Sequence, residues 1–181
     1  VCRKENGKQA WMCPYYQKWA GMILRASGNK KFLKKSPTYE GVKVCDEWKL
    51  FSNFRRWMEK QDWEGKHLDK DLLGDGKVYS PETCAFLSQA LNNFLEIRPG
   101  KYLTGATYDK SRDRYQAQCT DPTGTFKSAH VGRYKTELEA HQAYRKRKYL
   151  IAVELAKRES DCRVAAALLR KYSIDDLEGV D

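Results

Sequence analysis

Long apolar segments are missing from this sequence. No run approaches the ~20 apolar residues that a membrane-spanning helix needs, so we expect no membrane partner. The chain also lacks a basic start that leads into an apolar core, which is the pattern of a secretion signal. These absences favour a cytoplasmic protein.

Closely spaced cysteine pairs are missing as well. The six cysteines are scattered through apolar patterns, which is typical of reduced and mostly buried thiols. Neither Cys45 nor Cys84 has another cysteine two to four residues away, as the spacing of a structural zinc site requires. We therefore expect neither disulfides nor bound zinc.

Positive charge is what the sequence has in excess. Its 181 residues include 34 Lys and Arg against 24 Asp and Glu, which gives a net charge of +10. Such an excess favours a polyanionic partner, and nucleic acid comes first when no membrane span is present. The length allows one large domain or two small ones.

The residues around position 69 form the most informative pattern. Residues 67–73 and 79–87 read as two short strands with a turn between them, followed by the start of a helix. Asp69 on the first strand and Asn92 on the helix would then face each other across a small gap. His67 lies two residues before Asp69, so both would share one side of the strand. This arrangement suits one hard divalent cation held against a phosphate.

The second half of the sequence predicts a small sheet and a long helix. Residues 104–108, 114–119 and 126–131 read as three short strands. A helix follows, for which Thr136 is placed as the amino-terminal cap and Glu139 completes a capping box.

The first half predicts two helices with loops around them. A helix is expected from Pro14 to about Ser27, because apolar residues recur at helical spacing after a proline in the first turn. Another is expected from about Ser52. Residues 30–35 read as a basic loop, and residues 1–9 as a loose lead-in.

These pieces, taken in order, resemble a known family. The pieces that carry the resemblance are residues 13–16, 37–39, 44–48, 51–54 and 68–93, followed by 105–117, 131–134 and 137–144. The first group resembles the HNH-type, ββα-metal endonucleases of bacteriophages. The second resembles the AP2-like DNA-binding domain that is joined to the nuclease in one subgroup. The resemblance covers roughly residues 13–156.

The resemblance implies one bound metal ion. In such nucleases an acidic side chain and an Asn or His of the following helix bind a single cation, which here gives Asp69 and Asn92. Asn93 is the alternative if the helix is shifted by one residue. Oxygen ligands suit Mg²⁺ or Mn²⁺ better than zinc.

The sequence departs from the family at the general base. The family has a histidine after the acidic ligand, and this chain has Lys70. A lysine at its ordinary pKa near 10.4 is a poor base at neutral pH. We expect Lys70 to act either as a base or as a cation that steadies the phosphate, with His67 or metal-bound hydroxide supplying the base. Thr83 replaces the asparagine that often orients the base in the family.

The AP2 resemblance implies a sheet whose outward side chains contact DNA. The expected contacts are Tyr108, Lys110, Arg112, Arg114, Gln116, Lys127 and His130. Alternate residues of a strand share a face, so Arg114 and Gln116 should point together away from the helix. Arg and Gln are the side chains that read guanine and adenine edges.

We therefore expect an α+β protein with two domains and a tail. Residues 1–98 would form an HNH-like ββα-metal nuclease domain with a helical extension, residues 99–158 an AP2-like domain, and residues 159–181 a helical or frayed tail. The expected function is metal-dependent nicking or cleavage of double-stranded DNA, by a phage-encoded monomer or weak dimer in a bacterial host. The alternative is a catalytically inactive DNA-binding protein, a regulator or inhibitor, on a degenerate nuclease scaffold.

Overall fold

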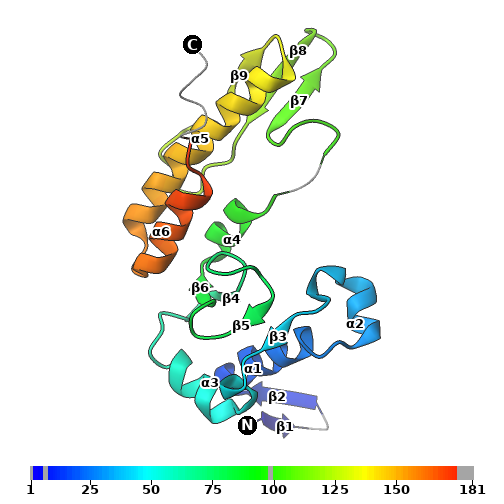
Figure 1. Ribbon diagram of the computed structural model, residues 1–181, viewed down its shortest axis with the longest axis vertical. Coiled ribbons are helices and arrows are strands. Elements are labelled where there is room, and N and C mark those ends of the chain that lie inside the picture. Colours follow the sequence, from blue (N-terminus) through cyan, green and yellow to red (C-terminus); the bar gives the residue numbers. More distant parts are fainter. Residues whose placement is uncertain (1, 6–7, 98–99, 175–181) are drawn as a thin grey trace. The chain divides into compact units, whose positions relative to one another are not determined.

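The computed structural model describes residues 2–5, 8–97 and 100–174, with side chains from residue 12 onward. The chain forms two compact units, Val1–Ser88 and Gln89–Asp181. Helices and small sheets are combined in both, so the fold is α+β, as the sequence predicts (Figure 1). Within the described part of the chain, no helix is both long and apolar enough to cross a bilayer. The acidic residues 175–178 lie outside that part.

Two helices of the first unit lie where the sequence predicts them. Helix α1 (Pro14–Arg25) begins at a proline, whose fixed φ suits a first helical turn. Helix α3 (Phe51–Met58) buries Phe54 and Met58. In both cases the apolar spacing of the sequence marks the buried face correctly.

The predicted loop at residues 30–35 is wrong, because these residues form helix α2 (Lys30–Lys35). The side chain of Asn29 accepts hydrogen bonds from the backbone N–H groups of Lys31 and Phe32. This amino-terminal cap satisfies donors that a short helix otherwise leaves free. The cap, and not an apolar face, is the signal for this helix.

The amino-terminal residues pair as a hairpin. Strand β1 (Cys2–Glu5) runs antiparallel to β2 (Lys8–Met12), so the expectation of a loose lead-in is wrong for these residues. The polar composition of this segment gave no strand pattern, since neither face is apolar.

The strands that carry the candidate site form two short pairs. Strand β3 (Lys43–Val44), which lies between the 3-10 turns η1 (Pro37–Tyr39) and η2 (Glu47–Lys49), runs parallel to β5 (Val78–Tyr79). Strand β4 (His67–Asp69) runs antiparallel to β6 (Ala85–Leu87). The predicted succession of strand, turn, strand and helix is thus present, with β5 inside the turn.

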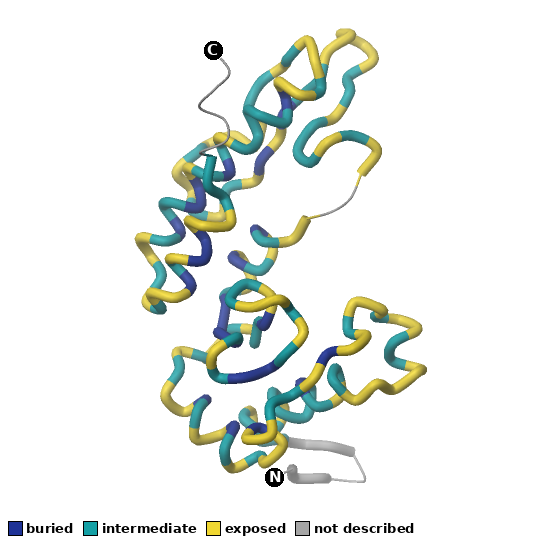
Figure 2. Tube along the Cα trace, viewed as in Figure 1, coloured by how far each residue is buried: buried dark blue, intermediate teal, exposed yellow. Residues whose placement is uncertain are grey.

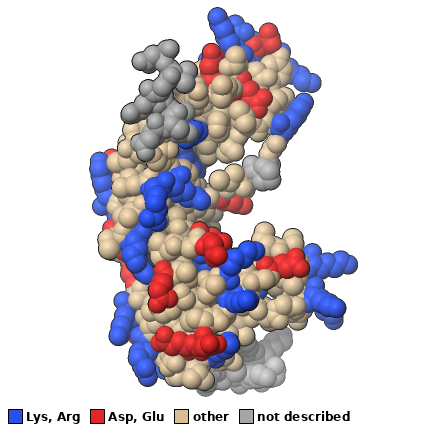
Figure 3. Space-filling model, viewed as in Figure 1, with Lys and Arg blue, Asp and Glu red and all other residues tan. Residues whose placement is uncertain are grey.

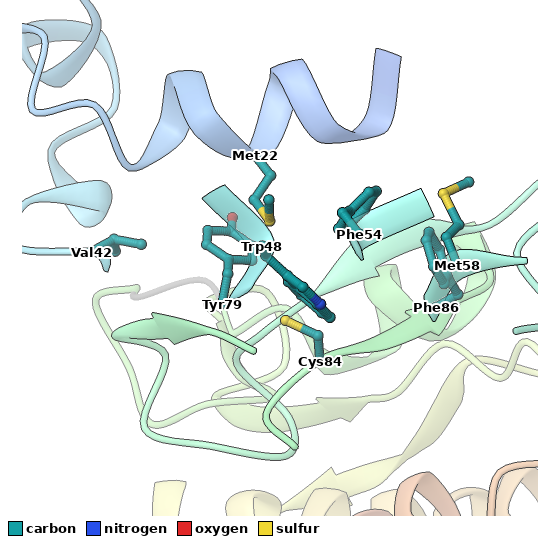
Figure 4. Close-up of a cluster of buried hydrophobic side chains, with 8 residues drawn as sticks. All are labelled: Met22, Val42, Trp48, Phe54, Met58, Tyr79, Cys84 and Phe86. Atoms are coloured by element: carbon teal, nitrogen blue, oxygen red, sulfur yellow. The ribbon is translucent and has the colours of Figure 1, made fainter. Parts of the chain in front are cut away.

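One apolar cluster fixes these strands to the helices of the first unit (Figure 4). Its buried members are Met22, Val42, Trp48, Phe54, Met58, Tyr79, Cys84 and Phe86. The rings of Trp48 and Phe54 meet edge to face, with centroids 5.1 Å apart. Burial of one such side chain contributes about 1.5–3 kcal/mol. The cluster draws on α1, α3, β5 and β6, so it holds the β4–β6 pair in place.

Helix α4 (Gln89–Leu95) belongs to the second unit. It buries Leu91 and Phe94, and the Phe94 ring lies 5.2 Å from that of Tyr172, which follows helix α6 (Cys162–Lys171). The helix that the sequence assigns to the nuclease half therefore places its apolar side chains within the carboxyl-terminal unit.

A three-stranded antiparallel sheet lies against helix α5 (Glu137–Arg158) (Figure 1). Its strands are β7 (Ala106–Asp109), β8 (Arg114–Gln118) and β9 (His130–Tyr134), in that order. The third strand begins four residues later than predicted. The Asp121 carboxylate accepts hydrogen bonds from the backbone N–H groups of Thr123 and Phe126, and these bonds hold the start of the predicted strand in a turn.

The predicted capping box of α5 is confirmed. The Thr136 hydroxyl accepts from the backbone N–H of Glu139, and the Glu139 carboxylate accepts from that of Thr136. Before β7, Gly105 has a φ of +82°, and a Cβ there would overlap the Tyr144 ring of α5. Only glycine lets the chain approach the helix so closely at this point.

Candidate metal centre and candidate nucleic-acid interface

The β4–β6 pair places His67 and Asp69 on one face. His67 lies opposite Leu87 and Asp69 opposite Ala85, so the two polar side chains are separated by Leu68 and alternate with it. His67 is exposed and Asp69 half-buried. Their shared side, expected from the sequence, is present.

One of the two oxygens of the Asp69 carboxylate accepts hydrogen bonds from the backbone. Its Oδ1 accepts hydrogen bonds from the N–H groups of Asp71 and Leu72, at 3.0 and 2.9 Å. Its Oδ2 accepts none within the described part of the chain. Burial raises the pKa of Asp69 above its usual range, although the bond from Leu72 lowers it. A half-buried carboxylate with one oxygen that accepts no hydrogen bond gains from a bound cation.

Lys70 does not lie on that face. It is buried, with 5 % of the residue exposed, and its Nζ donates to Asp71 Oδ1 at 2.6 Å. The ammonium also lies 5.3 Å from the Tyr39 ring and 5.7 Å from the Tyr79 ring. The Lys70 ammonium is therefore engaged by groups of its own unit. These contacts hold the segment after β4 against η1 and β5.

Thr83 has a structural environment too. Its hydroxyl donates to the Val78 carbonyl oxygen at 2.7 Å and accepts from the Ser80 N–H at 3.1 Å. The side chain thus ties the turn between β5 and β6. None of these bonds reaches His67.

The expected second ligand lies on α4, in the other unit. The side-chain amide of Asn92 makes no hydrogen bond among the described residues, whereas Asn93 Oδ1 accepts from Gln89 Nε2 at 2.8 Å. Asn92 is therefore the freer of the two candidates. Asp69 and Asn92 belong to different units, Val1–Ser88 and Gln89–Asp181.

The chemistry of the nearby side chains decides which metals fit. No three His, Cys, Asp or Glu side chains gather as a ligand cluster in the residues that the structure describes. Two protein oxygens are enough for Mg²⁺ or Mn²⁺ when waters complete the shell. Cys84 is a poor ligand here, because burial raises the pKa of its thiol to about 12. As an oxygen ligand, Asp69 thus fits a hard cation better than zinc.

The strand register of the second unit defines one polar face of the sheet, which we call the polar sheet face. Its members are Thr107, Asp109, Arg114, Gln116, Gln118, His130 and Arg133. The opposite face carries Ala117, which is buried toward α5. Arg114 and Gln116 share the polar sheet face, as predicted.

Tyr108 lies on the other face, which corrects its expected position. It pairs with Tyr115, and their ring centroids are 5.1 Å apart. The residues directly opposite each other in an antiparallel pair share a face, so Tyr108 points to the side of Tyr115. Its hydroxyl reaches around to donate to Asp113 Oδ1 at 2.6 Å.

Asp109 organises the polar sheet face. Its Oδ2 accepts from Gln116 Nε2 at 2.6 Å and from Arg112 at 3.1 Å, and its Oδ1 accepts from Ser111. The bond from Ser111 is the main cause of a pKa of Asp109 well below the usual range, and those from Arg112 and Gln116 add to it. No local sequence pattern indicates this role, because Asp109 and Gln116 meet only through the strand register.

The other expected contacts lie around this face. Lys110 and Arg112 are exposed at the β7–β8 turn, Lys127 before β9, and His130 at its start (Figure 2). Lysine and arginine side chains gather at the tip of that hairpin, beside acidic ones (Figure 3). Arg133 was not among the expected contacts, although it lies directly opposite Gln116.

The four successive cations of α5 have unequal surroundings. Lys146 is exposed, whereas Lys148 is buried. Arg147 lies 3.9 Å from the centre of the Phe126 ring and donates to the Ser128 carbonyl oxygen. The run is thus mostly packed against its own unit.

A second basic surface lies on α2 (Figure 3). Its exposed lysines are Lys30, Lys31, Lys34 and Lys35. They recur one turn apart, and none forms an ion pair within the described residues. This surface is open to an anionic partner.

Comparison with known proteins adds no relative. No family model matches the sequence, and neither a curated protein nor a solved structure is similar to it.

Proposed function

We propose that this chain is a metal-dependent DNA endonuclease whose carboxyl-terminal unit binds double-stranded DNA. The observation that carries the proposal is the half-buried Asp69 carboxylate, whose Oδ2 accepts no hydrogen bond among the described residues, beside the exposed His67 on one strand face. A carboxylate and an imidazole on one face supply a cation ligand and a proton acceptor for phosphodiester hydrolysis.

The polar sheet face supports DNA as the substrate. Arg114 and Arg133 are exposed there and flank Gln116, with no carboxylate paired to either guanidinium in the described residues. Guanidinium groups bind phosphates and guanine edges, and glutamine binds adenine edges. The net charge of +10 adds a general attraction to the phosphate backbone.

The Asp69 carboxylate would hold the cation. When bound, Mg²⁺ or Mn²⁺ supplies charge stabilisation for the phosphate and for the leaving oxygen. His67, exposed on the face of Asp69, would take a proton from the attacking water. The backbone N–H groups of Asp71 and Leu72 keep the Asp69 carboxylate oriented. Lys70 contributes by packing and not by contact with the substrate.

A non-catalytic DNA-binding protein is the second candidate. The observation in its favour is the position of Lys70, where the family resemblance leads one to expect a histidine base. Its ammonium is buried against Asp71 and two tyrosine rings. A scaffold that uses this position for packing has lost one catalytic group, and His67 would then have to replace it.

Supercoiled plasmid separates the two candidates. We expect the full chain to nick plasmid with Mg²⁺ or Mn²⁺ and to stop in chelator. Asp69→Ala should not cut, whereas Asp62→Ala should cut normally, because Asp62 lies outside the β4–β6 pair and its carboxylate accepts from Lys66. Both variants should bind a labelled duplex equally.

Three results would redirect the assignment. Metal-dependent cutting that survives Asp69→Ala would remove the metal site from this face. Tight binding without cutting, at any metal concentration, would favour the second candidate. Absence of duplex binding at low salt would exclude both.

A further inference from the structure

A small cavity of about 240 Å³ lies inside the carboxyl-terminal unit. Its lining comes from the segment after α4, from α5, and from the end of α6. The residues are Ile97, Thr104, His141, Tyr144, Arg145, Lys148, Lys171, Tyr172 and Ser173. It lies outside the polar sheet face and outside the candidate metal centre, so neither function above uses it.

The cavity wall is cationic. Arg145, Lys148 and Lys171 contribute three positive charges, and no Asp or Glu is among the described residues that line it. Arg145 donates to the Ser173 carbonyl oxygen at 3.5 Å. An anion in the cavity would interact favourably with all three charges.

Lys148 is the most telling of the three. Only 7 % of the residue is exposed, and no carboxylate pairs with it in the described part of the chain. Its Nζ donates to the Phe94 carbonyl oxygen and lies 3.7 Å from the Phe94 ring centre and 5.4 Å from that of Tyr172. Burial lowers the pKa of Lys148, because the charged form loses hydration there.

The Tyr172 hydroxyl is a second informative group at the cavity. The oxygen is buried and has no hydrogen-bond partner among the described residues. Burial raises the pKa of this phenol above its usual range, so the hydroxyl keeps its proton and remains a donor. The hydroxyl and the Lys148 ammonium border the same space, and among the described residues the hydroxyl lacks an acceptor and the ammonium lacks a counter-charge.

We infer that this cavity binds a small phosphate-bearing anion, through Arg145, Lys148, Lys171 and the Tyr172 hydroxyl. Lysine and arginine are the side chains that bind phosphoryl oxygens, and the hydroxyl adds a neutral donor. The volume lies below the usual range of drug-sized pockets, about 300–1,000 Å³, which favours free phosphate or a small phosphomonoester. The depth of Lys148 argues against a phosphate of duplex DNA.

Binding of inorganic phosphate to the full chain tests the inference. We expect phosphate to raise the melting temperature and to give a saturable isotherm, relative to chloride at the same ionic strength. Arg145→Gln and Lys171→Gln should each weaken phosphate binding at least tenfold. Lys146→Gln is the matched control, because this exposed residue of α5 does not line the cavity.

Tyr172→Phe protects the test against general loss of folding. The hydroxyl has no partner in the described residues, so its removal should weaken phosphate binding while leaving the melting temperature in chloride unchanged or higher. Equal phosphate affinity in Arg145→Gln and Lys146→Gln would overturn the inference. Absence of any saturable signal would do so as well. If a short duplex competes with phosphate, the cavity binds a phosphate of DNA, and the inference of a small free ligand is wrong.

Discussion

Replacement of Lys70 by methionine separates a structural from a catalytic role. Methionine keeps the apolar stem and removes the ammonium, which bonds Asp71 at 2.6 Å and lies within 5.7 Å of two tyrosine ring centres. Because the position is buried and the contacts join β4 to η1 and β5, we expect Lys70→Met to lower stability. Because it lies off the face of Asp69, we expect cutting by the folded variant to persist.

The magnitude follows from the contacts. The Asp71 side chain is 67 % exposed, so solvent screens the ion pair, and such a pair contributes at most about 1 kcal/mol. The ring contacts add about 0.5–2 kcal/mol for a desolvated cation. Methionine recovers part of this free energy, because its side chain is uncharged and burying it costs no hydration of a charge. The free energy of unfolding should therefore fall by about 1–2 kcal/mol, the size of an ordinary destabilising substitution.

Urea denaturation followed by tryptophan fluorescence measures this change. All five tryptophans lie in the first unit, so the signal reports on the unit that contains Lys70. Lys77→Met is the matched control on the same segment, because Lys77 is exposed and should move stability by less than about 0.5 kcal/mol. A Lys70→Met protein with wild-type stability and no cutting would refute the reasoning and return Lys70 to the reaction.

Three further predictions concern the two candidate sites. Asp69→Asn should abolish cutting. The same variant should stabilise the first unit in chelator at neutral pH, measured by urea denaturation. The reason is that the pKa of the native carboxyl is raised, so its charged form opposes folding. For the same reason, the contribution of Asp69 to wild-type stability should decline as pH rises above its ordinary pKa of 3.8, measured in chelator against Asp69→Asn. Gln116→Ala should reduce the preference for a selected duplex by about 1–3 kcal/mol in competition assays, while the affinity for non-specific DNA stays the same. Asp109→Asn should cause part of the same loss.

Elements that depend on local sequence were predicted well. The caps of α5, the proline start of α1 and the strand pair around Asp69 all rest on spacing within a few residues. Helix α2 was missed because its lysine-rich sequence has no buried face. The cap at Asn29 would have indicated it.

The position of Tyr108 depended on a turn that the sequence does not specify. Asp109 pairs with Arg114, and Asp113 between them has a left-handed φ of 51°. The number of residues in such a turn sets which side chains of the next strand share a face with the first. Composition does not give the number of residues in the turn. The face of Tyr108 was therefore predicted wrongly, and Arg133 was not predicted as a contact.

Lys70 could have been placed from the sequence. The alternation that puts His67 and Asp69 on one side of β4 puts the next residue on the other. The family resemblance instead predicts that Lys70 acts in the site. The aromatic partners of Lys70, by contrast, come from η1 and β5, and no local pattern announces them.

The carboxylate of Asp109 has a consequence for how DNA would be searched. It places a negative charge on the polar sheet face, at the end of β7, and uses one amide N–H of Gln116, so this side chain is already ordered before any base arrives. The ordering removes much of the side-chain entropy loss, up to about 2 kcal/mol, from the moment of binding. The charge repels the backbone of every duplex alike. On random sequence the face would thus hold DNA loosely and leave it quickly, and only a matching base edge would lengthen the stay.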